Sequence, residues 1–226
     1  MLRAVIFDFD GVITDSEILH LRAFNKVLAQ LGIEISTKDY YKEYLGLMDA
    51  DCFKLVAERS QRSLDCRDIR NLMAQKNEIF EELAKTEGRI IEGVPQFLQM
   101  LHRNDVPMAI CSGALLAEIE LILEEARLRH FLSVIVSAEH VKKGKPNPQG
   151  FLLALQRLNR SRPKPIRPEQ CIVIEDSHWG LEAAKAAGMH TVAVTNSYDA
   201  DQLSLAEKIV DRLDELSIEQ LRQFCV

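Results

Sequence analysis

Two aspartates follow a short apolar run near the start of the chain. Residues 5–15 read Val-Ile-Phe-Asp-Phe-Asp-Gly-Val-Ile-Thr-Asp, which places Asp8 and Asp10 two positions apart. Residues two apart on a strand share a face, so both carboxylates are expected to point the same way. Like charges held so close repel each other, and a bound divalent cation is one way to hold them. The plainer alternative is an acidic turn after a buried strand.

Three further groups of polar residues follow later apolar runs. Ser112-Gly113 offers a hydroxyl and backbone N–H groups for a phosphate oxygen, although the same pair is common in a helix-capping turn. Lys145, stiffened by the prolines after it, offers a compact ammonium for a phosphate, although it also fits a solvated basic loop. Glu175-Asp176 offers the hard carboxylate oxygens that Mg²⁺ prefers, although acidic residues also stabilise an ordinary helix start.

Five short apolar runs are expected to be the strands that position these groups. Their continuous apolar character is typical of parallel strands covered on both faces. Segments with helical periodicity separate them, so we predict an α/β fold with a doubly wound parallel sheet, whose strand ends meet in one crevice. The runs are Ala4–Phe9, Pro107–Cys111, Ser133–Ser137, Cys171–Glu175 and Thr191–Thr195, and the helices are Gly93–Asn104, Leu115–Arg127 and Gly180–Ala187.

One long segment interrupts this alternation. From Ser16 to about Glu87 no convincing strand is visible, and apolar residues repeat with helical spacing between Ile18 and Leu31 and between Leu72 and Leu83. We therefore predict a core of residues 1–15 and 89–226, with a helical-bundle cap of residues 16–88 inserted after the first strand. The cap is expected to act as a lid, although its helices could also pack on the sheet as an ordinary layer.

Composition narrows the function classes. The 226 residues suit one domain with an insertion, and a net charge of −6 without a basic stripe argues against a nucleic-acid partner. Five scattered cysteines without a CxxC pair argue for a reducing compartment and against structural zinc. No stretch approaches the ~20 apolar residues of a membrane span, and no cleavable leader is visible. We expect a cytoplasmic protein without a membrane partner, and a monomer by default.

The four polar groups together resemble the motifs of the haloacid dehalogenase superfamily, in the same order and at about the same spacing. The resemblance covers nearly the whole chain, and the helical segment is similar to the cap of the beta-phosphoglucomutase-like group. Residues Ala206–Leu216 also resemble the closing strand and helix of that group. The motifs read Asp8-Phe-Asp-Gly-Val-Ile-Thr-Asp15, Ser112-Gly113, Lys145-Pro-Asn-Pro148 and Glu175-Asp-Ser-His-Trp-Gly180.

The resemblance implies a catalytic role for residues of the first three motifs. Asp8 is the implied nucleophile that forms an aspartyl-phosphate, and Asp10 is the implied acid and base. Ser112, Gly113 and Lys145 are implied to hold the transferring phosphoryl group, and Lys145 also to neutralise Asp8. Members of the family that cleave carbon–halogen bonds lack the second aspartate, so the presence of Asp10 disfavours dehalogenation.

The same resemblance implies a Mg²⁺ site. Asp8 and Asp176 are the implied side-chain ligands, and Asp10 is implied to contribute its backbone carbonyl. Glu175 is a further candidate, expected either to bind the ion or to lie next to its ligands.

The cap is expected to choose the substrate. His20 and Lys76 match positions that face the crevice in many capped relatives, although His20 could simply cover the hinge and Lys76 could be a solvated helix residue. In beta-phosphoglucomutases an arginine holds the distal phosphate of a bisphosphate at about the position of Asp49, where an acidic residue would repel it. Gln149 replaces an aspartate that often follows the lysine motif.

These observations favour a Mg²⁺-dependent phosphatase whose partner is a small-molecule phosphate ester, such as a sugar or polyol phosphate. The alternative within the same chemistry is a beta-phosphoglucomutase-like phosphohexomutase, which passes the phosphoryl group to a second hydroxyl. A non-catalytic binding protein with the same fold is an alternative of a different class.

Overall fold

The chain folds into two compact units in the computed structural model, which describes residues 1–45, 47–160 and 162–225. Met1–Asp15 and Ile90–Val226 form the first, which we call the core unit, and Ser16–Arg89 form the second, the helical unit. Arg89, expected in the core, therefore groups with the helical residues. No helix in the described ranges combines the length and the apolar character that a membrane crossing requires.

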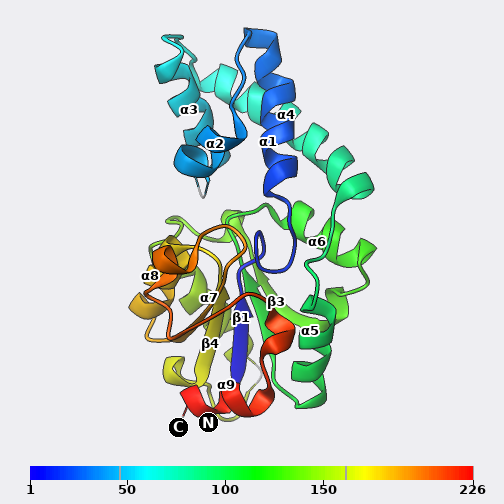
Figure 1. The fold of residues 1–226 in the computed structure, drawn as a ribbon, viewed down its shortest axis with the longest axis vertical. Helices are drawn as coiled ribbons and strands as arrows, with labels where there is room; N and C mark the ends of the chain where they lie inside the picture. Colours follow the sequence, from blue (N-terminus) through cyan, green and yellow to red (C-terminus); the bar gives the residue numbers. More distant parts are fainter. Residues whose placement is uncertain (46, 161, 226) are drawn as a thin grey trace. The chain divides into compact units, whose positions relative to one another are not determined.

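The core unit is built on a six-stranded parallel sheet (Figure 1). The strand order is β3-β2-β1-β4-β5-β6, so the chain starts in the middle of the sheet and winds outward in both directions. This order brings the carboxyl ends of β1, β2 and β4 next to one another, which is where open α/β sheets bind ligands. The strands are β1 (Ala4–Phe7), β2 (Met108–Cys111), β3 (Leu132–Val136), β4 (Cys171–Glu175), β5 (His190–Val194) and β6 (Lys208–Val210).

Helices cover both faces of this sheet. On one face, Ala4, Ile6 and Val173 pack in one apolar cluster with residues of α7 (Gln149–Asn159) and α8 (His178–Ala186). On the other face, the Phe7 ring lies edge-on to Phe97 of α5 (Val94–Arg103), with 6.0 Å between the ring centroids. Burial on both faces explains why the strands read as continuous apolar runs. The remaining elements are α6 (Leu116–Glu125), α9 (Ile218–Phe224) and five short 3-10 turns, η3 (Arg129–Phe131), η4 (Ala138–His140), η5 (Pro168–Gln170), η6 (Ala200–Leu203) and η7 (Leu213–Glu215).

The five predicted strands are all present, but three predictions about their surroundings are wrong. The first strand ends at Phe7, because the Phe9 carbonyl accepts hydrogen bonds from the N–H groups of Ile13 and Thr14 and so turns the chain back. Asp8 and Asp10 are thus loop residues, and strand alternation does not orient them. In the Ala206–Leu216 segment the predicted closing helix is only the short turn η7, and the α-helix α9 follows it.

The helical unit has no strand among its described residues, as the sequence predicts. Its apolar stripes meet in one core, in which Phe24 and Phe53 lie with ring centroids 5.1 Å apart. Ile18, expected on the first stripe, is instead exposed. The elements are α1 (Glu17–Leu28), η1 (Ala29–Leu31), α2 (Thr37–Asp39), the π-helical turn η2 (Tyr40–Tyr44), α3 (Asp49–Arg59) and α4 (Cys66–Glu87).

Candidate active site

The loop after β1 brings Asp8 to the end of β4. The Asp8 N–H donates to the carbonyl of Ile174 at 2.9 Å, which continues the pairing of the two strands past the end of β1. Gly11 then turns the chain with a left-handed φ of 75°. A Cβ at Gly11 would overlap the carboxylate of Asp176, so the loop can approach that side chain only with glycine.

Three carboxyl groups gather at this point. Asp8, Glu175 and Asp176 are all buried, and each offers an oxygen such that the three atoms lie within 4.8 Å of one another. Carboxylate oxygens are the ligands that a hard divalent cation takes, and three of them this close strongly favour a counter-charge. The donor set therefore fits a divalent metal ion.

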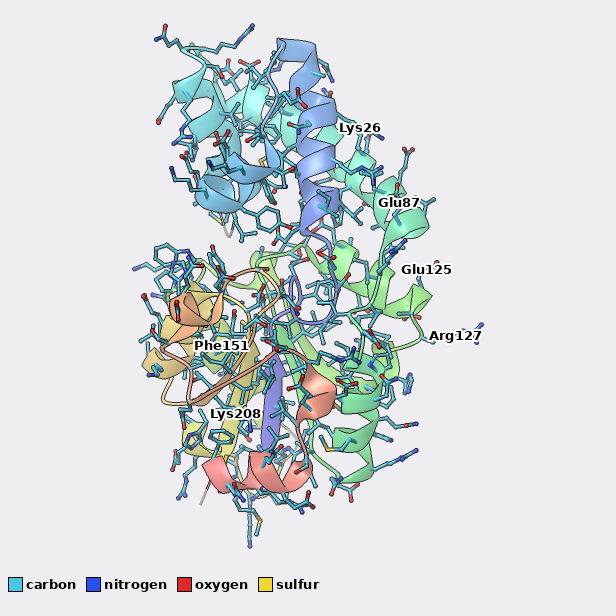
Figure 2. The ribbon with its side chains drawn as sticks, viewed as in Figure 1. Lys26, Glu87, Glu125, Arg127, Phe151 and Lys208 are labelled. Carbon is cyan, nitrogen blue, oxygen red and sulfur yellow. The ribbon has the colours of Figure 1, made fainter. Side chains whose placement is uncertain are left out.

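Lys145 supplies one positive charge to this cluster. Its ammonium donates to Asp8 Oδ1 at 2.6 Å and also hydrogen bonds to Glu175 Oε1. The ammonium lies 5.4 Å from the ring centroid of Phe151 on α7, a residue labelled in Figure 2. Two carboxylates and an aromatic ring thus fix the lysine that the sequence motif singles out.

Burial and neighbouring charges have opposing effects on the pKa values of Lys145 and Glu175. Burial lowers the pKa of Lys145, but the Asp8 and Glu175 carboxylates raise it more, so its pKa lies above the ordinary range and the side chain stays charged. Burial raises the pKa of Glu175 to about 7, with the Lys145 ammonium opposing the rise. A divalent cation next to Glu175 would favour its ionised form.

The start of α8 holds Glu175 in place. Glu175 Oε2 accepts hydrogen bonds from the Ser177 hydroxyl at 2.9 Å and from the N–H groups of Asp176 and Ser177. The same hydroxyl oxygen accepts from the N–H of Gly180, which makes Ser177 the N-cap of this helix. A Cβ at Gly180 would overlap the Glu175 carboxylate, so this position also needs glycine.

Ser112 and Asp10 are near each other beside this cluster. Ser112 is buried at the end of β2, and its N–H donates to the Val136 carbonyl at 2.9 Å. Its hydroxyl donates to Asp10 Oδ2 at 3.5 Å and accepts from the N–H of Ala114. The helix α6 begins at Leu116, one residue after the predicted start at Leu115, and Gly113 lies exposed between Ser112 and this helix.

Two polar side chains hold the loops that carry Lys145 and the aspartates Asp8 and Asp10. Gln149 Oε1 accepts hydrogen bonds from the N–H groups of Lys142 and Lys143, both at 3.1 Å, and so ties the lysine loop to α7. Asn196 after β5 donates to the carbonyl of Gly11 at 2.7 Å, which holds the aspartate loop. The sequence analysis did not identify Asn196, because a single asparagine after a strand carries no motif.

The helical unit holds a second buried lysine. Lys76 on α4 donates to Asp49 Oδ2 and is paired with His20 Nδ1, both at 2.9 Å. His20 stacks on Phe80, with ring centroids 4.0 Å apart. Lys76 is only 1% exposed, so it is not a solvated helix residue. The two cap residues that the resemblance implies are thus brought together, with Asp49 as a third member. Gly46 lies outside the described residues.

The chain is similar to several known proteins. The family described as haloacid dehalogenase-like hydrolase matches residues 5–194. The fructose-1-phosphate phosphatase YqaB of Escherichia coli strain K12 is 32% identical over 195 residues, which are 84% of this chain and 95% of that protein. The chloroplastic 5-amino-6-(5-phospho-D-ribitylamino)uracil phosphatase of Arabidopsis thaliana is 37% identical over 161 residues, or 71% of this chain, which spans only 42% of that longer protein.

A solved structure gives the same result for the fold. The crystal structure of beta-phosphoglucomutase from Clostridium difficile superposes with a TM-score of 0.86 at 26% identity, and the match covers 100% of this chain and 97% of that one. The family pattern covers most of the sequence, and the Escherichia coli relative matches most of both chains. On these grounds the chain belongs to the haloacid dehalogenase-like hydrolases.

Proposed function

We propose that this hydrolase uses Mg²⁺ to cleave a small phosphomonoester, a sugar or polyol phosphate, through an aspartyl-phosphate at Asp8. The reaction class, hydrolysis of a phosphoric monoester, is supported by the family and by the named phosphatases among the relatives of this chain. The use of Mg²⁺ and of an aspartyl-phosphate is supported by the residues of the site. The choice of a sugar phosphate is supported by the name of the Escherichia coli relative.

The single observation that supports the proposal most is the cluster of Asp8, Lys145, Glu175 and Asp176 at the carboxyl ends of the parallel strands. Phosphoryl transfer needs a nucleophile and positive charge to offset the charge on the phosphate oxygens. Asp8 supplies the nucleophile. Lys145, whose ammonium lies 2.6 Å from Asp8 Oδ1, supplies part of the positive charge.

The proposed reaction has two steps. In the first, a carboxylate oxygen of Asp8 forms a bond to phosphorus while the bond from phosphorus to the alcohol oxygen breaks, and Asp10 gives a proton to that oxygen. In the second, Asp10 takes a proton from water, whose oxygen attacks phosphorus and releases inorganic phosphate from Asp8. Ser112 and Lys145 hold the phosphoryl oxygens during both steps.

Mg²⁺ fits the donor set of this site. Asp8 and Asp176 would hold it through their side chains, with the backbone carbonyl of Asp10 and with Glu175 as further candidates. When bound, the ion supplies positive charge to the phosphate oxygens.

A phosphohexomutase is the second candidate. The likeness to beta-phosphoglucomutase over the whole chain favours it, because the two reactions share the aspartyl-phosphate and differ only in its acceptor. In the mutase a second sugar hydroxyl replaces water, so exclusion of water decides between them.

The first experiment measures phosphate release from a panel of phosphomonoesters with Mg²⁺, in the wild type and in Asp8→Asn. The amide is a far weaker nucleophile than the carboxylate, so we expect turnover to fall by about 10⁴-fold. Asp201→Asn, which makes the same chemical change at an exposed residue of the core unit, is the matched control and should keep full activity.

Two results would contradict this proposal. Turnover that survives Asp8→Asn would remove Asp8 as the nucleophile. Absence of phosphate release from every ester, together with isomerisation of a hexose 1-phosphate primed by its bisphosphate, would establish the mutase instead.

A further inference from the structure

The loop after β5 is a fifth chain segment at the candidate active site. β5 pairs with β4 in parallel, so the carboxyl ends of both strands lie at the same edge of the sheet. Residues 195–198 of this loop read Thr-Asn-Ser-Tyr. The family pattern ends at residue 194, just before them, and none of the four motifs includes them. Any part that this loop takes in the chemistry must therefore follow from its contacts.

Two residues of the loop lie against the turn that follows Asp10. The side-chain amide of Asn196 donates to the carbonyl of Gly11 at 2.7 Å. A Cβ at Gly11 would lie 2.7 Å from the hydroxyl oxygen of Ser197, in addition to overlapping the Asp176 carboxylate. Gly11 is therefore close to the ends of both β4 and β5.

Gly11 needs hydrogen bonds on both of its sides to keep one conformation. Glycine adopts positive and negative φ with similar ease, so the φ of 75° is not fixed by the residue itself. The Gly11 N–H donates to the carbonyl of Thr14 at 2.8 Å, which fixes the peptide bond between Asp10 and Gly11. In the described part of the chain no backbone N–H donates to the Gly11 carbonyl, so the Asn196 amide fixes the next peptide bond.

The loop that carries Asn196 is itself anchored at both ends. The hydroxyl of Thr195 donates to Asp211 Oδ1 at 2.7 Å, directly after β6. At the other end, the Tyr198 ring lies edge-on to His178 of α8, with ring centroids 5.2 Å apart. These contacts connect the loop to the sheet and to α8, so the Asn196 amide approaches Gly11 from a segment that is held independently of the aspartate loop.

We propose that Asn196 is a positioning residue for Asp10: by holding the Gly11 carbonyl, it keeps the Asp10 carboxyl group where it can give its proton to the leaving oxygen. The inference rests on the proposed phosphatase reaction and deepens it, because it names a residue outside the four motifs on which the proton transfer depends. Asn196 acts through Gly11 and not on the substrate. Small displacements of a proton donor are costly, since general acid catalysis requires it within hydrogen-bond reach.

The choice of leaving group separates this role from a general loss of stability. A sugar alcohol is a poor leaving group that needs the proton from Asp10, whereas p-nitrophenolate leaves readily without it. Misplacement of Asp10 should therefore slow cleavage of a sugar phosphate more than that of p-nitrophenyl phosphate. The appropriate measure is kcat/KM, because it covers the steps up to the transfer of the phosphoryl group to Asp8.

The test compares Asn196→Ala with the wild type in Mg²⁺, on p-nitrophenyl phosphate and on fructose 1-phosphate or whichever sugar phosphate the wild type hydrolyses fastest. We expect kcat/KM to fall about tenfold for the sugar phosphate and less than about twofold for the aryl phosphate. Asn159→Ala is the matched control, because the Asn159 amide donates to the Ile166 carbonyl at 2.9 Å before the amino end of β4, at the opposite edge of the sheet. It should leave the ratio of the two kcat/KM values unchanged.

A second variant and a second measurement support the first. Asn196→Asp keeps the size of the side chain but removes the donor, so it should shift the ratio in the same direction. Hydrogen–deuterium exchange followed by mass spectrometry should show faster exchange of residues 8–14 in Asn196→Ala, but not in Asn159→Ala. An unchanged ratio in both Asn196 variants, or unchanged exchange of residues 8–14, would overturn the inference.

Failure of the inference and failure of the proposed function give different results. A wild type that hydrolyses both esters, with Asn196 variants that slow both equally, is a phosphatase in which Asn196 only stabilises the fold. A wild type that hydrolyses neither ester lacks the proposed activity, whatever the variants do. Circular dichroism melting of each variant identifies any that fail to fold, and Asn196→Asp then replaces Asn196→Ala in the comparison.

Discussion

The molecule buries two lysines beside carboxylates, one in each unit, and their surroundings differ in charge. Lys145 of the core unit contacts Asp8 and Glu175, and Asp176 lies near those two carboxylates, so this cluster has three carboxyl groups and one ammonium. Lys76 of the helical unit faces one carboxylate and one neutral imidazole. The first cluster has an excess of negative charge, whereas the second is balanced.

This difference indicates what each cluster can bind. Three buried carboxyl groups held close together favour a bound cation, because the cation offsets their mutual repulsion. A balanced pair attracts no ion strongly and offers only hydrogen bonds. The comparison therefore agrees with the metal and phosphoryl chemistry proposed for the core cluster, and it gives no reason for an ion to bind at the helical one.

Removal of metal should affect the core cluster alone, and it should have the largest effect of the tests on this comparison. We expect EDTA to reduce phosphate release by about 100-fold or more and Mg²⁺ to restore it, because the ion stabilises charge in the transition state. Mg²⁺ should also raise the melting temperature of the wild type. That rise should disappear in Asp176→Asn and persist in Asp49→Asn.

Two results would contradict the expected difference between the clusters in metal binding. Full activity in EDTA would show that the three carboxylates do not serve a metal. A melting response to Mg²⁺ that depends on Asp49 would place the cation in the helical unit.

Replacing each buried lysine with methionine should lower the free energy of unfolding by different amounts in the two clusters. Lys145→Met leaves Asp8 and the fully buried Glu175 without a counter-charge, so we expect a loss of about 3 kcal/mol in metal-free urea unfolding. Lys76→Met leaves only Asp49, which is 23% exposed and can be hydrated, and methionine keeps favourable contact with the aromatic rings. That loss should be about 1 kcal/mol.

Lys185→Met, at an exposed position of α8, is the control and should change stability little. Equal losses in the two buried variants would mean that the charge balance around them does not matter.

The sequence predicts the core cluster better than the helical one, for a physical reason. Each core residue lies at or after the carboxyl end of an apolar strand, and parallel strands bring their carboxyl ends together whatever the side chains between them. The polar groups at positions 8, 112, 145 and 175–176 could therefore be expected at one edge of the sheet once a parallel sheet is predicted. Their distances depend on loops, such as the turn fixed by the Phe9 carbonyl, that no periodic pattern describes.

The pairing of Lys76 with Asp49 could not be predicted in this way. The two residues lie 27 positions apart on helices whose facing sides are set by how their apolar stripes pack. Helical periodicity identifies the buried stripe, but Lys76 is a charged residue within it and reads as exposed. Only the packed structure shows that Phe24 and Phe80 surround its ammonium.

The smallest expected effect is a change in how the free energy of unfolding depends on pH. It tests whether His20, which lies beside Lys76, is neutral in the folded protein. Burial, and then the Lys76 ammonium, lower the pKa of His20 well below 6.5. The unfolded chain therefore binds a proton on His20 below about pH 6.5 that the folded protein does not, so His20 makes stability fall as pH decreases from 6.5. The slope is at most about 1.4 kcal/mol per pH unit.

His20→Gln should remove this contribution and leave a flatter profile between pH 7 and pH 5.5, because the amide oxygen still accepts from Lys76 but does not titrate. The measurement is urea unfolding at several pH values. His102→Gln, an exposed residue of α5, is the matched control and should keep the wild-type slope. If the His20→Gln profile equals that of the wild type, His20 is protonated in the folded protein. Its Nδ1 then cannot accept from Lys76, and the helical cluster has an excess of positive charge rather than a balance.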